Sequence, residues 1–133
     1  MIGLHLSETL RLLDVVDLTV CCKIYKVCNG NQFEIMRGSE FVDLLNLKPL
    51  SRPVQVRFRE KSRVCFLLYC ISREFMNETL GKEWILQILK RCNIEPNYYK
   101  SHYKDAESAG AAEENTAFAL AVKNAIFEAK SML

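Results

Sequence analysis

The sequence predicts an α+β fold, an antiparallel sheet of about four strands in two hairpins with helices packed against it. Asn29-Gly30, the dipeptide that most strongly favours a two-residue hairpin turn, separates two runs of strand-like composition. A second apolar run, at residues 64–71, follows a segment in which apolar and charged residues alternate. The last third of the chain instead has apolar residues at helical spacing.

The first predicted hairpin pairs residues 18–28 with residues 32–37. Residues 18–28 are rich in β-branched and aromatic side chains, which pack well on a pleated surface. Residues 32–37 alternate in the way expected of a return strand. Leucines at helical spacing precede this hairpin and predict an N-terminal helix over residues 4–16, which ends where Asp17 breaks the pattern.

The second predicted hairpin pairs residues 54–59 with residues 64–71. Residues 54–59 present apolar side chains on one face and glutamine and arginine on the other. Residues 64–71 are apolar on both faces, so we expect them at the centre of the sheet. Their charged partner then lies at the edge, where charge discourages pairing with another chain. A short helix over residues 40–47, capped by Ser39, connects the hairpins.

The C-terminal third is predicted to be helical. One helical pattern begins at Ser72 and runs to about Cys92, and residues 97–104 form either a short helix or a loop. The predicted organisation is an α+β core domain at residues 1–104, a flexible connector of small and polar residues at 105–112, and a C-terminal helix at 113–133. That helix packs on the core or on a second subunit.

Length and composition favour an ordinary cytoplasmic domain. The chain has 133 residues and a net charge of +2, and no apolar run approaches the roughly 18 residues of a membrane span. Its start has no basic region before the apolar residues, which a secretory signal would have. The six cysteines include no C-x-x-C pair, so we expect reduced thiols and neither a metal site nor another cofactor.

Catalytic motifs are scarce in the sequence. The five glycines are isolated, so they form no phosphate-binding loop, and the only two histidines are His5 and His102. We therefore predict a protein without enzymatic activity or a small-molecule substrate. A Cys–His or Ser–His pair that uses His102 stays open as an alternative, because such pairs form in space rather than in sequence.

The tyrosine-rich segment at residues 98–104 is the first candidate binding surface. Tyrosine gives a protein interface a large contact area at a low cost in conformational entropy. The predicted partner-binding residues are Tyr98, Tyr99, His102 and Tyr103. The alternative is that Tyr99 and Tyr103, four residues apart, only dock this segment onto the core.

Basic residues in the middle of the chain are the second candidate. Residues 51–104 carry eleven Lys and Arg against five Asp and Glu. Guanidinium groups on one face of a hairpin can hold phosphates, and aromatic residues beside lysines can stack on bases. The residues of this nucleic-acid alternative are Arg57, Arg59, Arg63, Lys100 and Lys104. The competing interpretation of the arginines is a solvated edge strand.

An alanine ridge in the last helix is the third candidate. Ala117, Ala121, Ala125 and Ala129 follow one another at intervals of four, which lets a neighbouring helix approach closely. The predicted self-association face is Phe118, Ala121, Val122 and Ala125, which would give a homodimer. Packing on the chain's own sheet explains the ridge equally well.

Together these patterns predict a small non-enzymatic binding protein that acts through protein–protein interaction, as a homo-oligomer. The alternative is a nucleic-acid-binding regulator that uses the basic hairpin edge and the Tyr/Lys-rich segment. Salt separates the two hypotheses, because affinity that rests on phosphate contacts falls steeply with ionic strength.

Overall fold

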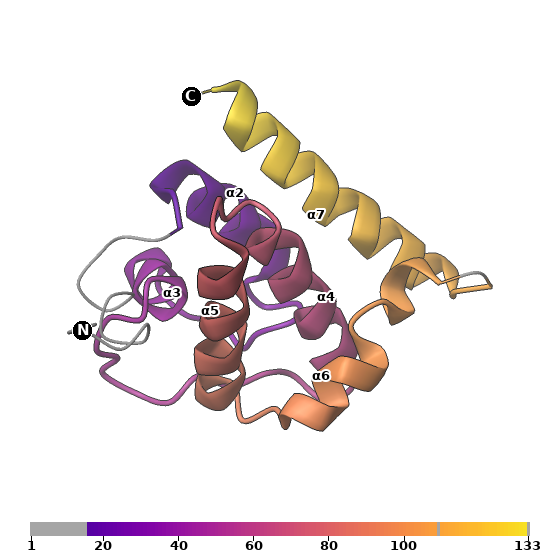
Figure 1. Ribbon diagram of the computed structural model, residues 1–133, viewed down its shortest axis with the longest axis horizontal. Helices are drawn as coiled ribbons and strands as arrows, with labels where there is room; N and C mark the ends of the chain where they lie inside the picture. Colours follow the sequence, from indigo (N-terminus) through magenta and orange to yellow (C-terminus); the bar gives the residue numbers. More distant parts are fainter. Residues whose placement is uncertain (1–15, 109, 133) are drawn as a thin grey trace.

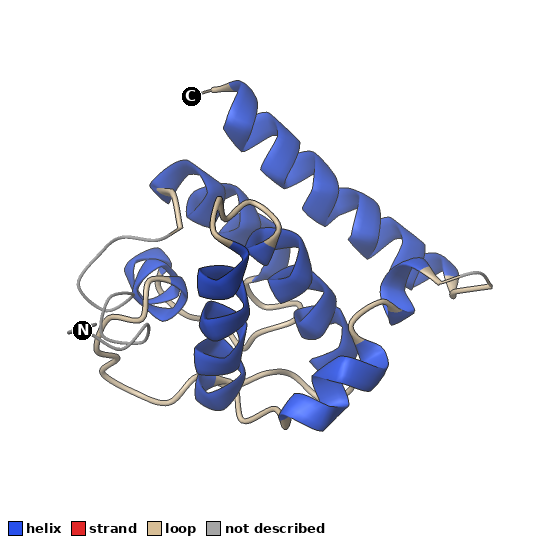
Figure 2. Cartoon of the chain, in the orientation of Figure 1, coloured by secondary structure: helices blue, strands red, loops and turns tan. Residues whose placement is uncertain are grey.

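Helices provide all the regular secondary structure in the part of the chain that the computed structural model describes, residues 16–108 and 110–132 (Figure 2). The elements in chain order are α2 (Leu18–Cys28), α3 (Gly38–Leu45), α4 (Lys61–Ser72), α5 (Glu78–Arg91), α6 (Pro96–His102), the 3-10 helix η1 (Asp105–Glu107) and α7 (Glu113–Ser131). The predicted α+β fold with a four-stranded sheet is therefore wrong. The predicted N-terminal helix falls, apart from Val16, outside the described residues.

Residues 18–28 form helix α2 instead of the predicted strand. The Asp17 side chain caps the helix by accepting hydrogen bonds from the backbone N–H groups of Thr19 (2.8 Å) and Val20 (3.3 Å). The buried side chains of α2 are spaced as one face of a helix: Val20, Cys21, Ile24 and Cys28. The sequence contained this spacing, but the β-branched composition outweighed it, and Asp17 was interpreted as a break rather than as a cap.

The predicted return strand at residues 32–37 and the predicted edge strand at residues 54–59 are extended loops. They touch through one isolated antiparallel bridge between Phe33 and Val56. Gly30 does form a tight turn with a positive φ of 77°, but the turn follows a helix instead of joining two strands. Because only one residue pair bridges the two loops, no sheet develops here.

The apolar run at residues 64–71 lies in helix α4, which occupies the interior of the fold (Figure 1). Val64, Cys65, Phe66, Leu67 and Leu68 are all completely buried. Helices α5, α6 and α7 and the 3-10 helix η1 all contact α4. A helix surrounded by other helices is apolar on every side, and a short apolar run of this kind cannot be distinguished from a buried strand by periodicity.

The other predicted helices exist, with shifted boundaries. The connecting helix is α3, which begins at Gly38 and contains Ser39 inside it, so Ser39 is not its cap. The pattern from Ser72 to Cys92 begins too early, because α4 ends at Ser72 and Asn77 caps α5 by accepting from Leu80 N–H at 3.1 Å. The C-terminal helix is confirmed as α7. In the predicted connector, η1 places Ala106 in the core.

Trp84 anchors α5 to α3 at the centre of the core. It is fully buried, and its indole N–H donates a hydrogen bond of 2.7 Å to the carbonyl oxygen of Leu45. Its ring lies 5.4 Å from that of Phe75. Truncation of such a residue to alanine costs about 3–5 kcal/mol, so this contact fixes the position of α5. Nearby, the Asn46 amide accepts from Val16 N–H at 2.8 Å and donates to its carbonyl oxygen at 3.2 Å.

All six cysteines are free thiols, and five of them are buried. Burial is the main cause that raises the thiol pKa to about 12 at Cys21, Cys65, Cys70 and Cys92. Cys22 is the exposed one. No helix in the described residues is both long and apolar enough to cross a membrane.

Candidate binding groove

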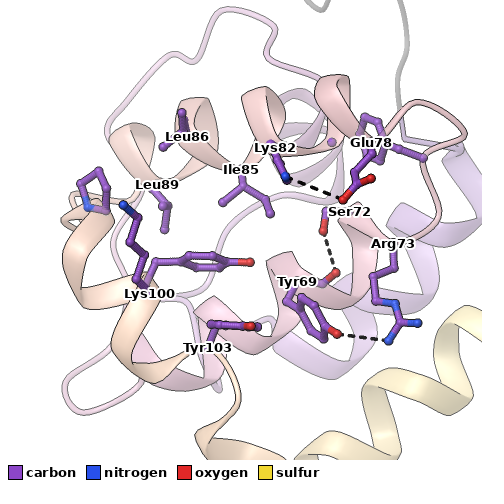
Figure 3. A pocket seen from close by; sticks show the side chains of 14 residues that line it. Tyr69, Ser72, Arg73, Glu78, Lys82, Ile85, Leu86, Leu89, Lys100 and Tyr103 are labelled. Carbon is purple, nitrogen blue, oxygen red and sulfur yellow. Dashed lines mark hydrogen bonds and ion pairs between the residues drawn. The ribbon is translucent and has the colours of Figure 1, made fainter.

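A hollow of about 720 Å³ opens between α4, α5 and α6 (Figure 3). Its size falls within the range of about 300–1,000 Å³ that is typical of ligand pockets. The hollow, called here the groove, is lined by Tyr69, Ser72, Arg73, Phe75, Glu78, Gly81, Lys82, Ile85, Leu86, Leu89, Pro96, Tyr99, Lys100 and Tyr103.

The end of α4 supplies one wall of the groove. Tyr69 and Arg73 lie four residues apart, on the same face of the helix. The Arg73 guanidinium donates a hydrogen bond of 3.1 Å to the Tyr69 hydroxyl and lies 5.5 Å from the centre of its ring. The Ser72 hydroxyl donates back to the Tyr69 carbonyl oxygen at 2.7 Å. The last turn of α4 therefore holds a polar surface beside an otherwise apolar helix.

Helix α5 supplies the apolar floor. Ile85 and Leu89 are buried, whereas Leu86, which also lines the groove, is 48% exposed. Gly81 allows α5 to start close to the end of α4, because a Cβ atom there would lie 3.1 Å from the Ser72 carbonyl oxygen. The glycine that weakens the helical pattern in the sequence thus lies at a tight contact between α5 and the end of α4, where a side chain would force a small shift.

Helix α6 closes the groove with two tyrosines. Pro96 occupies the first turn of α6, where its missing N–H costs nothing. The rings of Tyr99 and Tyr103 stack with a centroid separation of 5.1 Å, and Tyr103 in turn contacts Tyr69 at 4.9 Å. The Lys104 ammonium lies within 5.7 Å of the ring centres of Tyr69 and Tyr103.

The hydroxyl groups of Tyr99 and Tyr103 have no hydrogen-bond partner among the described residues, whereas that of Tyr69 accepts from Arg73. Burial raises the pKa of Tyr99 well above its ordinary value of 10.0. The Tyr99 phenol therefore keeps its proton at neutral pH and can donate a hydrogen bond to a group that enters the groove.

Positive charge surrounds the groove. Within the described residues, no carboxylate lies within ion-pair distance of Arg73, Lys100 or Lys104. The carboxylate of Glu78 lines the groove, but it is exposed and pairs with Lys82 at 3.7 Å. The groove thus combines an apolar floor and two tyrosine hydroxyls with two lining cations, Arg73 and Lys100, and Lys104 beside them, none of which has a carboxylate partner in the described part of the chain.

The structure divides the predicted partner-binding residues between the two sides of α6. Tyr99 and Tyr103 line the groove, as described above. Tyr98 and His102 lie on the other side, with ring centres 4.4 Å apart. The His102 ring nitrogen Nδ1 is 2.7 Å from the Asp105 carboxylate. His102 is therefore oriented by a neighbour three residues away, and it is not part of the groove.

The predicted nucleic-acid residues also fall into two places. Lys100 lines the groove and Lys104 lies beside it, over the rings of Tyr69 and Tyr103, whereas Arg57 and Arg63 line a second hollow, of about 530 Å³, beside the start of α7. Arg63 donates to Glu60 at 2.6 Å and to the Asn115 side chain at 2.7 Å. Arg57 pairs with Glu34 at 3.6 Å and donates to the Gly30 carbonyl oxygen.

Arg59 differs from these two arginines. It is exposed and lies 5.1 Å from the ring centre of Phe58, which is itself 85% exposed. The guanidinium groups of Arg57 and Arg63 thus contact partners in the chain, although Arg57 is itself exposed, whereas the guanidinium of Arg59 lies against the Phe58 ring. The nucleic-acid hypothesis stays a prediction, with its residues on separate surfaces.

The predicted self-association residues lie where α7 packs on α2 and α4. Phe118, Val122 and Ala125 are buried in the chain's own core, and Ala121 is half-buried. Ion pairs also hold α7 in place, among them Lys130–Glu74 at 3.0 Å. A second copy of the chain can reach the three buried residues only if α7 leaves this position. The homodimer stays a prediction.

Sequence reasoning missed the groove residues on α4 and α5. The assignment of residues 64–71 to a strand separated Tyr69 from Arg73, although they are four residues apart. Had the segment been treated as a helix, Tyr69, Ser72 and Arg73 would have stood out as polar residues on one face of an apolar helix. No comparable signal marks Leu86, because its partial exposure depends on how α6 is placed.

In the described residues, no group of three or more His, Cys, Asp and Glu side chains is arranged to hold a metal ion. Comparisons of the chain with protein-family models, with curated proteins and with solved structures give no match.

Proposed function

We propose that this chain is a non-enzymatic binding protein that acts by protein–protein interaction, and that the groove between α4, α5 and α6 is its docking surface. The observation that carries the proposal is the combination of an apolar floor with two tyrosine hydroxyls that have no partner in the described chain. Polar groups without partners on an apolar surface are features that bind and orient a ligand.

The extent of the apolar surface favours a protein over a small molecule. Leu86 is 48% exposed at the side of the groove, and Pro96 is also exposed there. Both residues line the groove and are exposed, so its apolar lining is open to solvent along a surface that a polypeptide segment can cover. Tyrosines and an arginine are also the residue types that protein interfaces favour.

The test is a selection of random peptides displayed on phage, performed against the full chain. Leu86→Arg places a charged side chain at the edge of the groove without disturbing the core. Leu120→Arg is the matched control, because Leu120 is 59% exposed on α7 and does not line the groove. Peptides that bind the unchanged chain should bind Leu120→Arg equally well and should lose about tenfold or more in affinity for Leu86→Arg.

A failure of the selection would be easy to recognise. If no peptide is enriched, or if Leu86→Arg and Leu120→Arg bind every enriched peptide as the unchanged chain does, the groove is not a docking surface. Circular dichroism of both variants shows whether the fold is intact, so that loss of binding is not confused with unfolding.

A further inference from the structure

The cations at the groove differ in their surroundings from the cations of α7. On α7, Lys123 pairs with Glu107 at 2.5 Å and Lys130 pairs with Glu74 at 3.0 Å. At the groove, Arg73, Lys100 and Lys104 have no carboxylate partner within the described chain. Three cations at one hollow form a local excess of positive charge, which a ligand of opposite charge would neutralise.

The cations stand on more than one side of the hollow. Figure 3 shows Lys100 and Arg73 on opposite sides, with Ile85 and Leu89 between them. Lys104 lies over the rings of Tyr69 and Tyr103, on the wall formed by α4 and α6. A ligand that fills the apolar floor therefore meets positive charge on both sides of its apolar part.

We propose that the groove binds an acidic segment of a partner protein, in which an apolar side chain is flanked on both sides by carboxylates. This inference rests on the proposed function and specifies the partner. The apolar side chain packs on Ile85 and Leu89, and the carboxylates reach Arg73 on one side and Lys100 on the other. The hydroxyls of Tyr99 and Tyr103 donate to acceptor groups of the bound segment.

Two other anionic ligands have part of this chemistry. A fatty acid has an apolar chain but only one carboxylate, so it would leave the cations on one side of the groove unmatched. Single-stranded nucleic acid could stack a base on a tyrosine, but the ring of Tyr99 is already stacked on that of Tyr103. The acidic polypeptide satisfies both the apolar floor and the cations on its two sides.

The experiment uses two displayed peptide libraries that share the same random apolar centre. One library has glutamate at the flanking positions and the other has lysine. Both are selected on the full chain, on a Lys100→Glu/Lys104→Glu double variant, and on a Lys26→Glu/Lys61→Glu double variant. The last is the control: it changes the net charge equally, at exposed lysines that do not line the groove.

The unchanged chain and the control should enrich the glutamate library about tenfold or more over the lysine library. The Lys100→Glu/Lys104→Glu variant should lose or reverse this preference. Binding of the enriched glutamate peptides should also be weakened by Leu86→Arg, which ties the charge preference to the groove.

Each contrary result has a defined meaning. If peptides bind in a way that depends on Leu86 but show no preference for glutamate, the acidic partner is ruled out and the proposed function stands. If no peptide depends on Leu86, both proposals fall. Oleate and a single-stranded oligothymidylate serve as competitors. Acidic partner specificity is also overturned if either of them displaces the peptides and binds more tightly through Lys100 and Lys104.

Discussion

The two ends of α4 carry similar residues in different environments. At the first turn, Arg63 donates to Glu60 and to Asn115, and the Glu60 carboxylate also accepts from the Gln32 side chain at 3.1 Å. At the last turn, the Arg73 guanidinium donates to the Tyr69 hydroxyl and lies near the Tyr69 ring. One arginine is thus part of an internal network, and the other faces a hollow without a carboxylate partner in the described chain.

This difference teaches that the partner of a basic residue, and not its presence, decides whether it can serve binding. Arg63, Lys100 and Lys104 are all basic, so the sequence alone predicts the same role for them. In the fold, Arg63 stabilises the folded chain, because removing it would leave the partly buried Glu60 without a counter-charge. Arg73 and the two lysines can change partner without a cost to the fold.

The largest expected effect is a loss of stability at alkaline pH. It comes from the buried thiols, two of which lie on α4 between its two ends. Burial raises the pKa of the Cys65 and Cys70 thiols to about 12, and the same holds for Cys21 and Cys92. The folded chain keeps these protons, whereas the unfolded chain releases them above the ordinary thiol pKa of 9.0. The free energy of unfolding is therefore unaffected below about pH 8 and falls as the pH rises towards about 12.

At about pH 10 each of these thiols should lower the free energy of unfolding by about 1 kcal/mol. Urea denaturation under reducing conditions, between about pH 7 and about pH 10, measures the slope. Cys22→Ser serves as the control, because it replaces the exposed thiol and leaves the five buried ones in place. A free energy of unfolding that stays constant across this pH range would show that the centre of α4 is accessible to water. The two ends of α4 would then not be separated by a buried interior.

The next effect tests the two arginines directly. Arg63→Met keeps the apolar stem but leaves Glu60 unpaired, and the side chains of this pair are only 21% and 16% exposed. We expect a loss of about 2 kcal/mol in the free energy of unfolding, measured in urea. Arg73→Met should change it by no more than about 0.5 kcal/mol, because Arg73 has no carboxylate partner in the described chain. Equal losses at the two positions would show that the two ends of α4 do not differ.

The sequence predicted helices α3, α5 and α7, but it failed at α4, and it failed at α2, where the β-branched composition outweighed a one-sided helical spacing. Helix α7 was identified with nearly correct limits because its acidic start and its basic end reinforce the spacing. Helix α4 was misassigned because it is buried on all sides, and its apolar run is short enough for a strand. The misassignment extended to residues 54–59, whose alternation of apolar and charged residues predicts a strand at the edge of the same sheet.

The groove could be predicted only in part for a related reason. Tyr99, Tyr103, Lys100 and Lys104 follow one another in a short segment, so their composition was visible. The remaining wall comes from α4 and α5, which lie earlier in the chain. Tyr69, for example, precedes Tyr103 by 34 residues. Which of the tyrosines face inward depends on the packing of α6, and no local pattern in the sequence determines that packing.

The smallest effect concerns two neighbouring tyrosines of α6 that face the two ends of α4. The Tyr98 hydroxyl interacts with the side chain of Ser62, in the first turn of α4. The Tyr99 hydroxyl faces the groove and has no partner in the described chain. Tyr98→Phe should therefore lower the free energy of unfolding by about 0.5–1 kcal/mol, whereas Tyr99→Phe should change it by no more than about 0.3 kcal/mol.

The two substitutions should affect peptide binding in the opposite order, with the larger effect at Tyr99. Tyr99→Phe removes a donor from the groove, so peptides selected on the unchanged chain should lose about threefold to tenfold in affinity for this variant. Tyr98→Phe should bind them unchanged, as measured by fluorescence anisotropy. Because the two substitutions remove the same atom from adjacent residues of one helix, a difference in both readouts can come only from the environment of each hydroxyl. If Tyr98→Phe weakens binding more than Tyr99→Phe does, the ligand contacts the other side of α6, and the groove is not where it binds.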